Sequence, residues 1–156
     1  MNADDLMDEA IEVARASPNR VRKVGAVLVA KEGGAKLTAF NTYPHGVRDV
    51  EERHAGDGRL VWMEHAERNA IFAAAKDGIA TEGASLTSTY FPCIDCARAI
   101  VQSGISDVHT LPPDLADPVW GKAFLSSRVI LQEGGVRLHF STRDPAEVCA
   151  ATMLRE

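Results

Sequence analysis

Residues 85–103, SLTSTYFPCIDCARAIVQS, join a short predicted strand to a predicted helix through Pro92. Ser85–Tyr90 has the composition of a β-strand, and the helix that follows runs to about Ser103, where Gly104 ends it. A strand that passes directly into a helix is typical of α/β proteins, in which helices connect the strands and cover the sheet. This stretch therefore predicts an α/β fold.

The same alternation extends to both sides of this stretch. The predicted elements are a helix over 4–16, strands over Val24–Ala30 and Lys36–Asn41 joined at Gly33-Gly34, a helix over His65–Lys76, a strand over Val108–Leu111, a helix over 118–132, a strand over Val136–Phe140 and a last helix that starts at Asp144-Pro145. The first two strands pair antiparallel, and the later ones need right-handed crossovers. We expect a three-layer α/β/α sandwich with a mixed five-stranded sheet, in one domain spanning residues 1–156.

Two of the predicted helices begin with residues that bind metals. His65 opens one, and Cys93 and Cys96 lie in the first turn of the other. One imidazole and two thiolates suit zinc, and a catalytic zinc site keeps its fourth position for water. Glu67, two residues after His65, would lie beside the metal without binding it and could move protons. This pattern, His-x-Glu followed by Pro-Cys-x-x-Cys, is the signature of zinc-dependent nucleobase deaminases.

A closed structural zinc site is the alternative, and it needs a fourth ligand. The candidates are His45, His54, His109 and Cys149, none of which has the spacing of a motif. In a non-enzymatic zinc module Glu67 would be dispensable, whereas in a deaminase its loss would abolish turnover while leaving zinc in place.

Composition and charge narrow the classes of function. The net charge of −5 argues against a protein that binds extended nucleic acid, because such proteins neutralise phosphates with clustered Lys and Arg. No apolar run approaches the roughly 20 residues of a membrane helix. The acidic N-terminal residues do not suggest an export signal, and three cysteines do not suggest a secreted disulfide framework. We therefore expect a cytoplasmic protein with no membrane partner.

The stretch from Ser17 to Val108 resembles deoxycytidylate (dCMP) deaminases of the cytidine/deoxycytidylate deaminase superfamily. The similarity is carried by Asn41–Asp49, by the residues from His65 to Ile71 and by the segment from Pro92 to Ala97. The resemblance implies a cytidine deaminase-like fold, a Zn²⁺ cofactor and hydrolysis of a ring amine, with dCMP converted to dUMP and ammonia. It also implies that Glu67 shuttles protons, that the Ala66 backbone contacts the base and that Asn41 contacts the sugar.

Two departures from the family pattern bear on the substrate. Residues 19–23, NRVRK, replace the small and hydroxyl residues typical of the family's phosphate pocket, so Arg22 and Lys23 become candidate phosphate ligands, with Arg48 as a third. The tyrosines that usually follow the fourth strand are missing. Trp120 is the nearest large aromatic residue that could lie over the base.

These departures keep other substrates open. The same motifs occur in deaminases of free bases or nucleosides such as cytosine, cytidine and guanine, and in transfer-RNA adenosine deaminases, which the acidic charge disfavours. Family members commonly form dimers or hexamers, so a homo-oligomer that binds a small-molecule nucleotide or nucleobase is expected. Glu64 is expected to orient a zinc ligand, and Asp95 to cap its helix.

Overall fold

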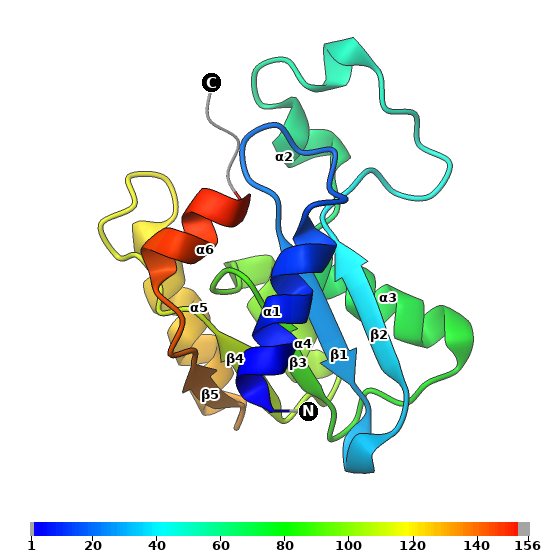
Figure 1. Cartoon of the computed structure of the whole chain (residues 1–156), viewed down its shortest axis with the longest axis vertical. Coiled ribbons are helices and arrows are strands. Elements are labelled where there is room, and N and C mark those ends of the chain that lie inside the picture. The colour runs from blue at the N-terminus through cyan, green and yellow to red at the C-terminus, as the bar shows by residue number, and fades with distance from the viewer. Residues whose placement is uncertain (1, 153–156) are drawn as a thin grey trace.

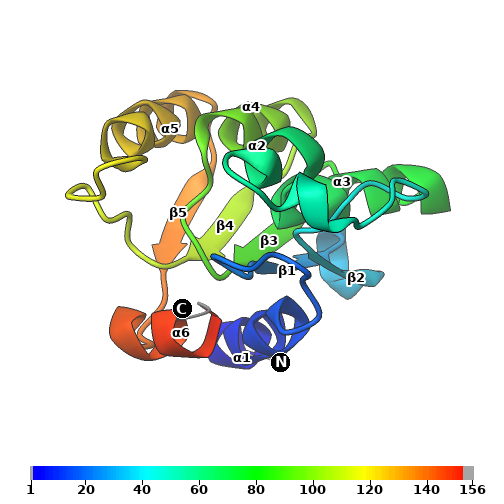
Figure 2. The same cartoon turned by 90° about the horizontal axis from the view of Figure 1, so that it is seen from above.

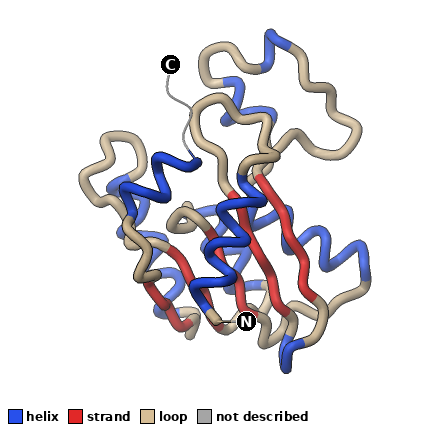
Figure 3. Tube along the Cα trace, in the orientation of Figure 1, coloured by secondary structure: helices blue, strands red, loops and turns tan. Residues whose placement is uncertain are grey.

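The computed structural model describes residues 2–152, and its centre is one five-stranded sheet (Figures 1 and 3). The strand order is β2-β1-β3-β4-β5. β1 pairs antiparallel with β2 and β3, whereas the β3–β4 and β4–β5 pairs are parallel. The bounds of the strands are Gly25–Val29 (β1), Lys36–Phe40 (β2), Ser85–Ser88 (β3), Asp107–Thr110 (β4) and Arg137–Phe140 (β5). The predicted mixed five-stranded sheet is confirmed.

Helices cover both faces of the sheet. Viewed from above, α1 and α6 lie on one side, and α3, α4 and α5 lie on the other (Figure 2). Their bounds are Ala3–Ala14 (α1), Ala66–Asp77 (α3), Ile94–Gln102 (α4), Gly121–Glu133 (α5) and Pro145–Thr152 (α6). The three-layer α/β/α sandwich is therefore confirmed, and each predicted element is present with ends that shift by at most three residues.

Small side chains allow α3 to lie close to β1 and β2. Ala66, Ala70 and Ala97 are fully buried against the sheet residues Leu28 and Leu86. Because alanine has high helix propensity and little volume, it serves both the helix and the close contact. The two helix N-termini that carry the candidate zinc ligands are held in this way by the core.

The polar stretch 42–64 shows no clear apolar period in the sequence, yet it is not entirely a loop. It contains a 3₁₀ turn, η2 (Glu51–Arg53), and a short helix, α2 (Gly58–Trp62). A five-residue helix is too short to show a helical period in the sequence, and isolated helices of this length are unstable. The guanidinium carbon of Arg53 lies 4.1 Å from the centre of the Trp62 ring, so contacts within the segment hold α2 in place.

No helix among residues 2–152 is long and apolar enough to cross a bilayer.

The contact between α1 and β1 leaves room only for hydrogen at Gly25. A Cβ at this position would lie 1.9 Å from the carbonyl oxygen of Ala10 and 2.8 Å from the amide nitrogen of Ala14. Gly25→Ala should therefore lower the free energy of unfolding by about 3 kcal/mol, as overpacking of a rigid contact does. Urea denaturation followed by circular dichroism measures this loss.

Gly34→Ala is the matched control, because Gly34 has a negative φ and its Cβ would meet nothing closer than 3.3 Å. Its effect should stay below about 1 kcal/mol. Equal losses for the two variants would contradict the close packing of α1 on β1.

Candidate active site

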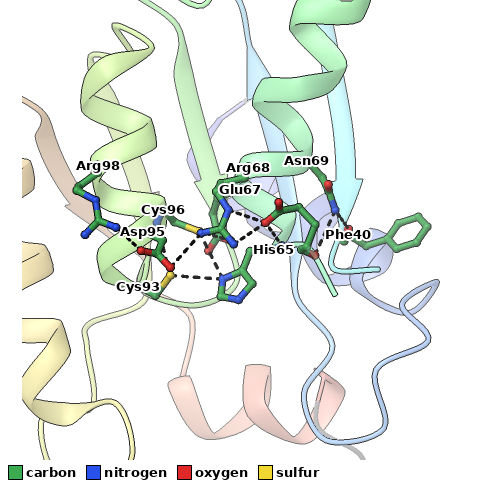
Figure 4. Close-up of polar contacts among 10 residues, drawn as sticks. Phe40, His65, Glu67, Arg68, Asn69, Cys93, Asp95, Cys96 and Arg98 are labelled. Atoms are coloured by element: carbon green, nitrogen blue, oxygen red, sulfur yellow. Dashed lines mark hydrogen bonds and ion pairs between the residues drawn. The ribbon is translucent and has the colours of Figure 1, made fainter. Parts of the chain in front are cut away.

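The ends of two helices bring the three predicted metal ligands together. His65 is the N-cap of α3, Cys93 is the N-cap of α4, and Cys96 lies in the first turn of α4 (Figure 4). The Nδ1 atom of His65 lies 3.4 Å from Cys93 Sγ and 3.5 Å from Cys96 Sγ. All three ligand atoms lie within 4.8 Å of one another.

These separations fit a zinc ion. With Zn–S bonds of about 2.3 Å and Zn–N bonds of about 2.0 Å, tetrahedral geometry sets sulfur and nitrogen ligands about 3.5 Å apart. Within residues 2–152, no other His, Cys, Asp or Glu ligand atom joins this group. The four candidates for a closed site, His45, His54, His109 and Cys149, are therefore not ligands in this arrangement. One His and two Cys leave one tetrahedral position to a water molecule or substrate.

The two thiols differ in acidity because they share a hydrogen bond. The hydrogen bond from Cys96, followed by that from His65, lowers the pKa of Cys93 to about 4. The hydrogen bond to Cys93, followed by burial, raises the pKa of Cys96. Cys93 Sγ also accepts a hydrogen bond from the Cys96 backbone N–H at 3.5 Å. The first turn of α4 therefore stabilises the negative sulfur, as a helix N-terminus does.

Glu67 lies in the first turn of α3, directly behind the cluster, and only 4% of its surface is exposed. Its Oε1 accepts a hydrogen bond of 2.9 Å from Ser88 Oγ, and its Oε2 lies 3.6 Å from Cys96 Sγ. Burial raises the pKa of the Glu67 carboxyl. A buried carboxyl with a raised pKa beside a metal centre has the properties of a general acid and base.

A cavity opens onto this cluster and encloses about 650 Å³ of space, part of it open to solvent. The residues that line it are Asn19, Arg22, Val24, Asn41, Arg59, Leu60, Met63, His65, Ala66, Glu67, Tyr90, Phe91, Cys93, Trp120 and Phe124.

Four of the six residues predicted to bind substrate line this cavity: Asn41, Ala66, Arg22 and Trp120. Lys23 and Arg48 do not. The Lys23 ammonium lies 3.3 Å from the carbonyl oxygen of Arg15, away from the cavity lining, and Arg48 is exposed on the loop before η2. Neighbouring side chains on an extended segment point in opposite directions, so Arg22 and Lys23 cannot both face the cavity.

Asn41 already has structural partners. Its Nδ2 donates to the carbonyl oxygen of Arg22 at 2.9 Å, and its Oδ1 accepts from the Val24 N–H at 2.8 Å. An amide can donate two hydrogen bonds and accept two, so one N–H and one lone pair of Asn41 remain for a ligand. Asn41 therefore fixes the segment that carries Arg22 as well as lining the cavity.

Several lining residues were not predicted from the sequence, notably Arg59 and Tyr90. Arg59 lies on α2, the helix that the sequence did not reveal. Tyr90 follows β3, between the strand and the cysteine motif, and the carbon at the centre of the Arg22 guanidinium lies 4.5 Å from its ring centre. A tyrosine two residues before the Pro92–Cys96 motif is a signal that the sequence contains, although the family pattern places the aromatic residue after β4.

The residues next to the ligands form a polar frame. Glu64 Oε1 accepts hydrogen bonds from the His65 backbone N–H at 3.0 Å and from Arg68 Nε at 2.5 Å, so Glu64 holds the start of α3. Its contact with His65 is to the backbone and not to the imidazole, and the expected orientation of a zinc ligand by Glu64 stays a prediction. The expected capping role of Asp95 is wrong. Asp95 pairs with Arg98, because the Cys93 sulfur already occupies the capping position.

The fold and this site define a class: an α/β/α sandwich with a His-Cys-Cys centre at the N-termini of two helices. Residues 1–111 match the family described as the cytidine and deoxycytidylate deaminase zinc-binding region. The chain belongs to this family of deaminases, whose members hydrolyse C–N bonds, and its cofactor is Zn²⁺.

The chain is 36% identical, over 118 residues, to an uncharacterized deaminase in the luxG 3′ region of Aliivibrio fischeri, a match that covers 74% of this chain and 77% of that protein. It is 30% identical to a probable deoxycytidylate deaminase of Drosophila melanogaster, with 73% of this chain and 61% of that protein covered. The solved apo structure of dCMP deaminase from cyanophage S-TIM5 superposes with a TM-score of 0.70 at 25% identity, covering 89% of this chain and 96% of that one.

Replacing one of the three ligand residues should remove zinc from the protein. Cys96→Ser should reduce bound zinc from about one ion per chain to below about 0.1, because a serine hydroxyl is a poor substitute for a thiolate ligand. Inductively coupled plasma mass spectrometry of the dialysed protein measures the metal content.

The third cysteine provides the control. Cys149 lies on α6 outside the cluster, so Cys149→Ser should keep its full zinc content. Loss of zinc from both variants, or from neither, would contradict the ligand set.

Proposed function

We propose that this chain is a zinc-dependent hydrolytic deaminase of a cytosine-containing nucleotide, which converts dCMP to dUMP and ammonia. The observation that carries the proposal is the buried Glu67 carboxylate beside the His65, Cys93 and Cys96 cluster, on the inner wall of a cavity that also contains Arg22. The relatives named as deoxycytidylate deaminases support the choice of ring and sugar.

The metal and Glu67 have separate roles in the proposed reaction. When bound by His65, Cys93 and Cys96, zinc supplies the Lewis acidity that makes a water molecule acidic near neutral pH. The Glu67 carboxylate takes a proton from this water and delivers it to the ring nitrogen beside the carbon that bears the amino group, while the water oxygen would form a bond to that carbon. A second proton transfer through Glu67 then allows the amine to leave as ammonia.

The position of Glu67 suits this role. Ser88 Oγ donates to Oε1 at 2.9 Å, which fixes the plane of the carboxylate and leaves Oε2 on the side of the cysteines. Because burial raises the pKa of the carboxyl, the group holds a proton more readily than an exposed glutamate and can return it within one catalytic cycle.

The cavity lining fits a substrate with an aromatic base and an anionic group. Trp120, Tyr90 and Phe124 offer ring surfaces, and Arg22 and Arg59 offer positive charge in a chain whose net charge is −5. Two arginines in one cavity favour an anion, because guanidinium groups match phosphate geometry. This is why a nucleotide is proposed in preference to a free base or nucleoside.

Glu67→Gln tests the catalytic role. The substitution keeps the shape of the side chain and removes its ability to accept a proton, so kcat for dCMP should fall by about 10²–10⁴-fold. Zinc content should remain near that of the unaltered protein, because Glu67 is not a ligand. Ammonia release and metal content are measured on the same preparation. Undiminished kcat would exclude Glu67 as the proton carrier.

The substrate is tested by comparing dCMP with deoxycytidine, cytosine and guanine in the same ammonia assay. We expect kcat/KM for dCMP to exceed that for deoxycytidine by about tenfold or more, since a charge-assisted bond to the phosphate contributes about 1.5–3 kcal/mol. Equal or faster turnover without the phosphate would replace the nucleotide with a nucleoside or free base as the substrate.

A further inference from the structure

The guanidinium of Arg22 is held by a ring rather than by a carboxylate. Its central carbon lies 4.5 Å from the centre of the Tyr90 ring. Its one ion pair among the described residues is with Asp117, at 3.7 Å, beyond hydrogen-bond distance. The Nε atom is buried and has no hydrogen-bond partner in the described part of the chain. The N–H groups of Arg22 are therefore largely unused.

Two other arginines of the chain are not available in this way. Arg20 makes two hydrogen bonds of 2.8 Å to Glu51, and Arg137 makes two of 2.8 and 2.7 Å to Asp107. In these pairs a carboxylate occupies the edge of the guanidinium. An aromatic ring instead attracts the guanidinium charge without taking up its N–H groups as a carboxylate does, so these groups stay free to bind an anion.

Tyr90 is itself fixed by α6. Its hydroxyl lies 3.1 Å from Thr152 Oγ1 and 3.5 Å from Cys149 Sγ. The carbonyl oxygen of Thr152 accepts a hydrogen bond of 2.8 Å from the backbone N–H of Lys23, the residue after Arg22. The end of α6 thus contacts both the ring and the segment that carries the guanidinium. In Figure 1, the end of α6 and the segment before β1 lie side by side.

We propose that Tyr90 is a positioning residue for recognition of the substrate's phosphate: its ring, anchored on α6, presents the edge of the Arg22 guanidinium to the anion. The inference rests on the proposed function, because it requires a nucleotide substrate. The phosphate binds to N–H groups that Tyr90 leaves free, and the loose ion pair with Asp117 gives way to it. Arg22 contacts the ligand, and Tyr90 acts through Arg22.

The test separates binding of the phosphate from the rest of the ligand. Isothermal titration calorimetry on the zinc-loaded full chain gives the dissociation constants of dUMP and of deoxyuridine, and their ratio reports the contribution of the phosphate. We expect dUMP to bind at least about tenfold more tightly than deoxyuridine to the unaltered protein. A change in the general shape of the cavity would weaken both ligands and leave the ratio unaltered.

Tyr90→Leu removes the ring face. The ratio of the dissociation constants of deoxyuridine and dUMP should then fall to within about threefold of one, because the variant loses a partly desolvated cation–π contact and its Arg22 side chain is no longer held in place. Tyr90→Trp keeps a ring face and should retain most of the preference for dUMP. If Tyr90→Leu does not fold, Tyr90→Met fills similar volume without a ring and takes its place.

A double-mutant cycle shows whether the ring acts through Arg22. In Arg22→Gln the ratio should already be near one, and adding Tyr90→Leu should not change it further. A ratio in Tyr90→Leu equal to that of the unaltered protein would overturn the inference. An additional loss of the same size in the Arg22→Gln background would also overturn it.

Failure of the inference can be distinguished from failure of the proposed function. If the unaltered protein deaminates dCMP but binds dUMP and deoxyuridine equally, the phosphate role of Arg22 and Tyr90 is refuted while the activity stands. If it prefers dUMP in an Arg22- and Tyr90-dependent manner but releases no ammonia from dCMP, the positioning role stands and the proposed reaction is refuted.

Discussion

The structure depends on the meeting of two helix N-termini at one end of β3. α3 brings His65, and α4 brings Cys93 and Cys96, so that three ligand atoms from segments 28 residues apart lie within 4.8 Å. Both helices must therefore point their positive ends at one place, which stabilises negative sulfur and the negative charge that develops during catalysis. The inner face of α3 carries Ala66, Ala70 and Ala74, which allows this helix to lie close to β1 and β2, and α4 packs against α3 and α5. A shift of either helix along the sheet would separate the ligands.

The walls of the cavity and its metal centre are built from different kinds of segment. The centre is built from the ends of core elements, whereas the walls come from segments far apart in the chain, including the segment before β1, α2 and the start of α5. Hydrogen bonds between distant parts of the chain hold the walls in place: Asn41 donates to the carbonyl oxygen of Arg22 and accepts from the Val24 N–H. This separation allows the reaction to be kept while the substrate-facing residues change, as expected for a fold in which function resides in the site.

The sequence predicted the ligands because their spacing has a local cause. In a helix, residues three apart lie on one face, so Cys93 and Cys96 face the same point whatever surrounds them. The strands and long helices were predictable for the same reason, since the spacing of apolar residues in each of them is visible in a short stretch of sequence. The prediction failed at two local details that no apolar period marks: α2 is too short to show a helical period, and the sulfur of Cys93 rather than Asp95 caps α4.

The sequence by itself therefore determined the fold class, the three candidate zinc ligands and the neighbouring Glu67, because each follows from a short-range pattern. Only the tertiary structure decided which cations face the cavity. Arg22 and Lys23 are adjacent and equally basic in the sequence, yet Arg22 lines the cavity under the Tyr90 ring while Lys23 lies against Arg15. The direction of a side chain on an extended segment, and the partner that fixes it, are set by distant residues such as Asn41 and Thr152.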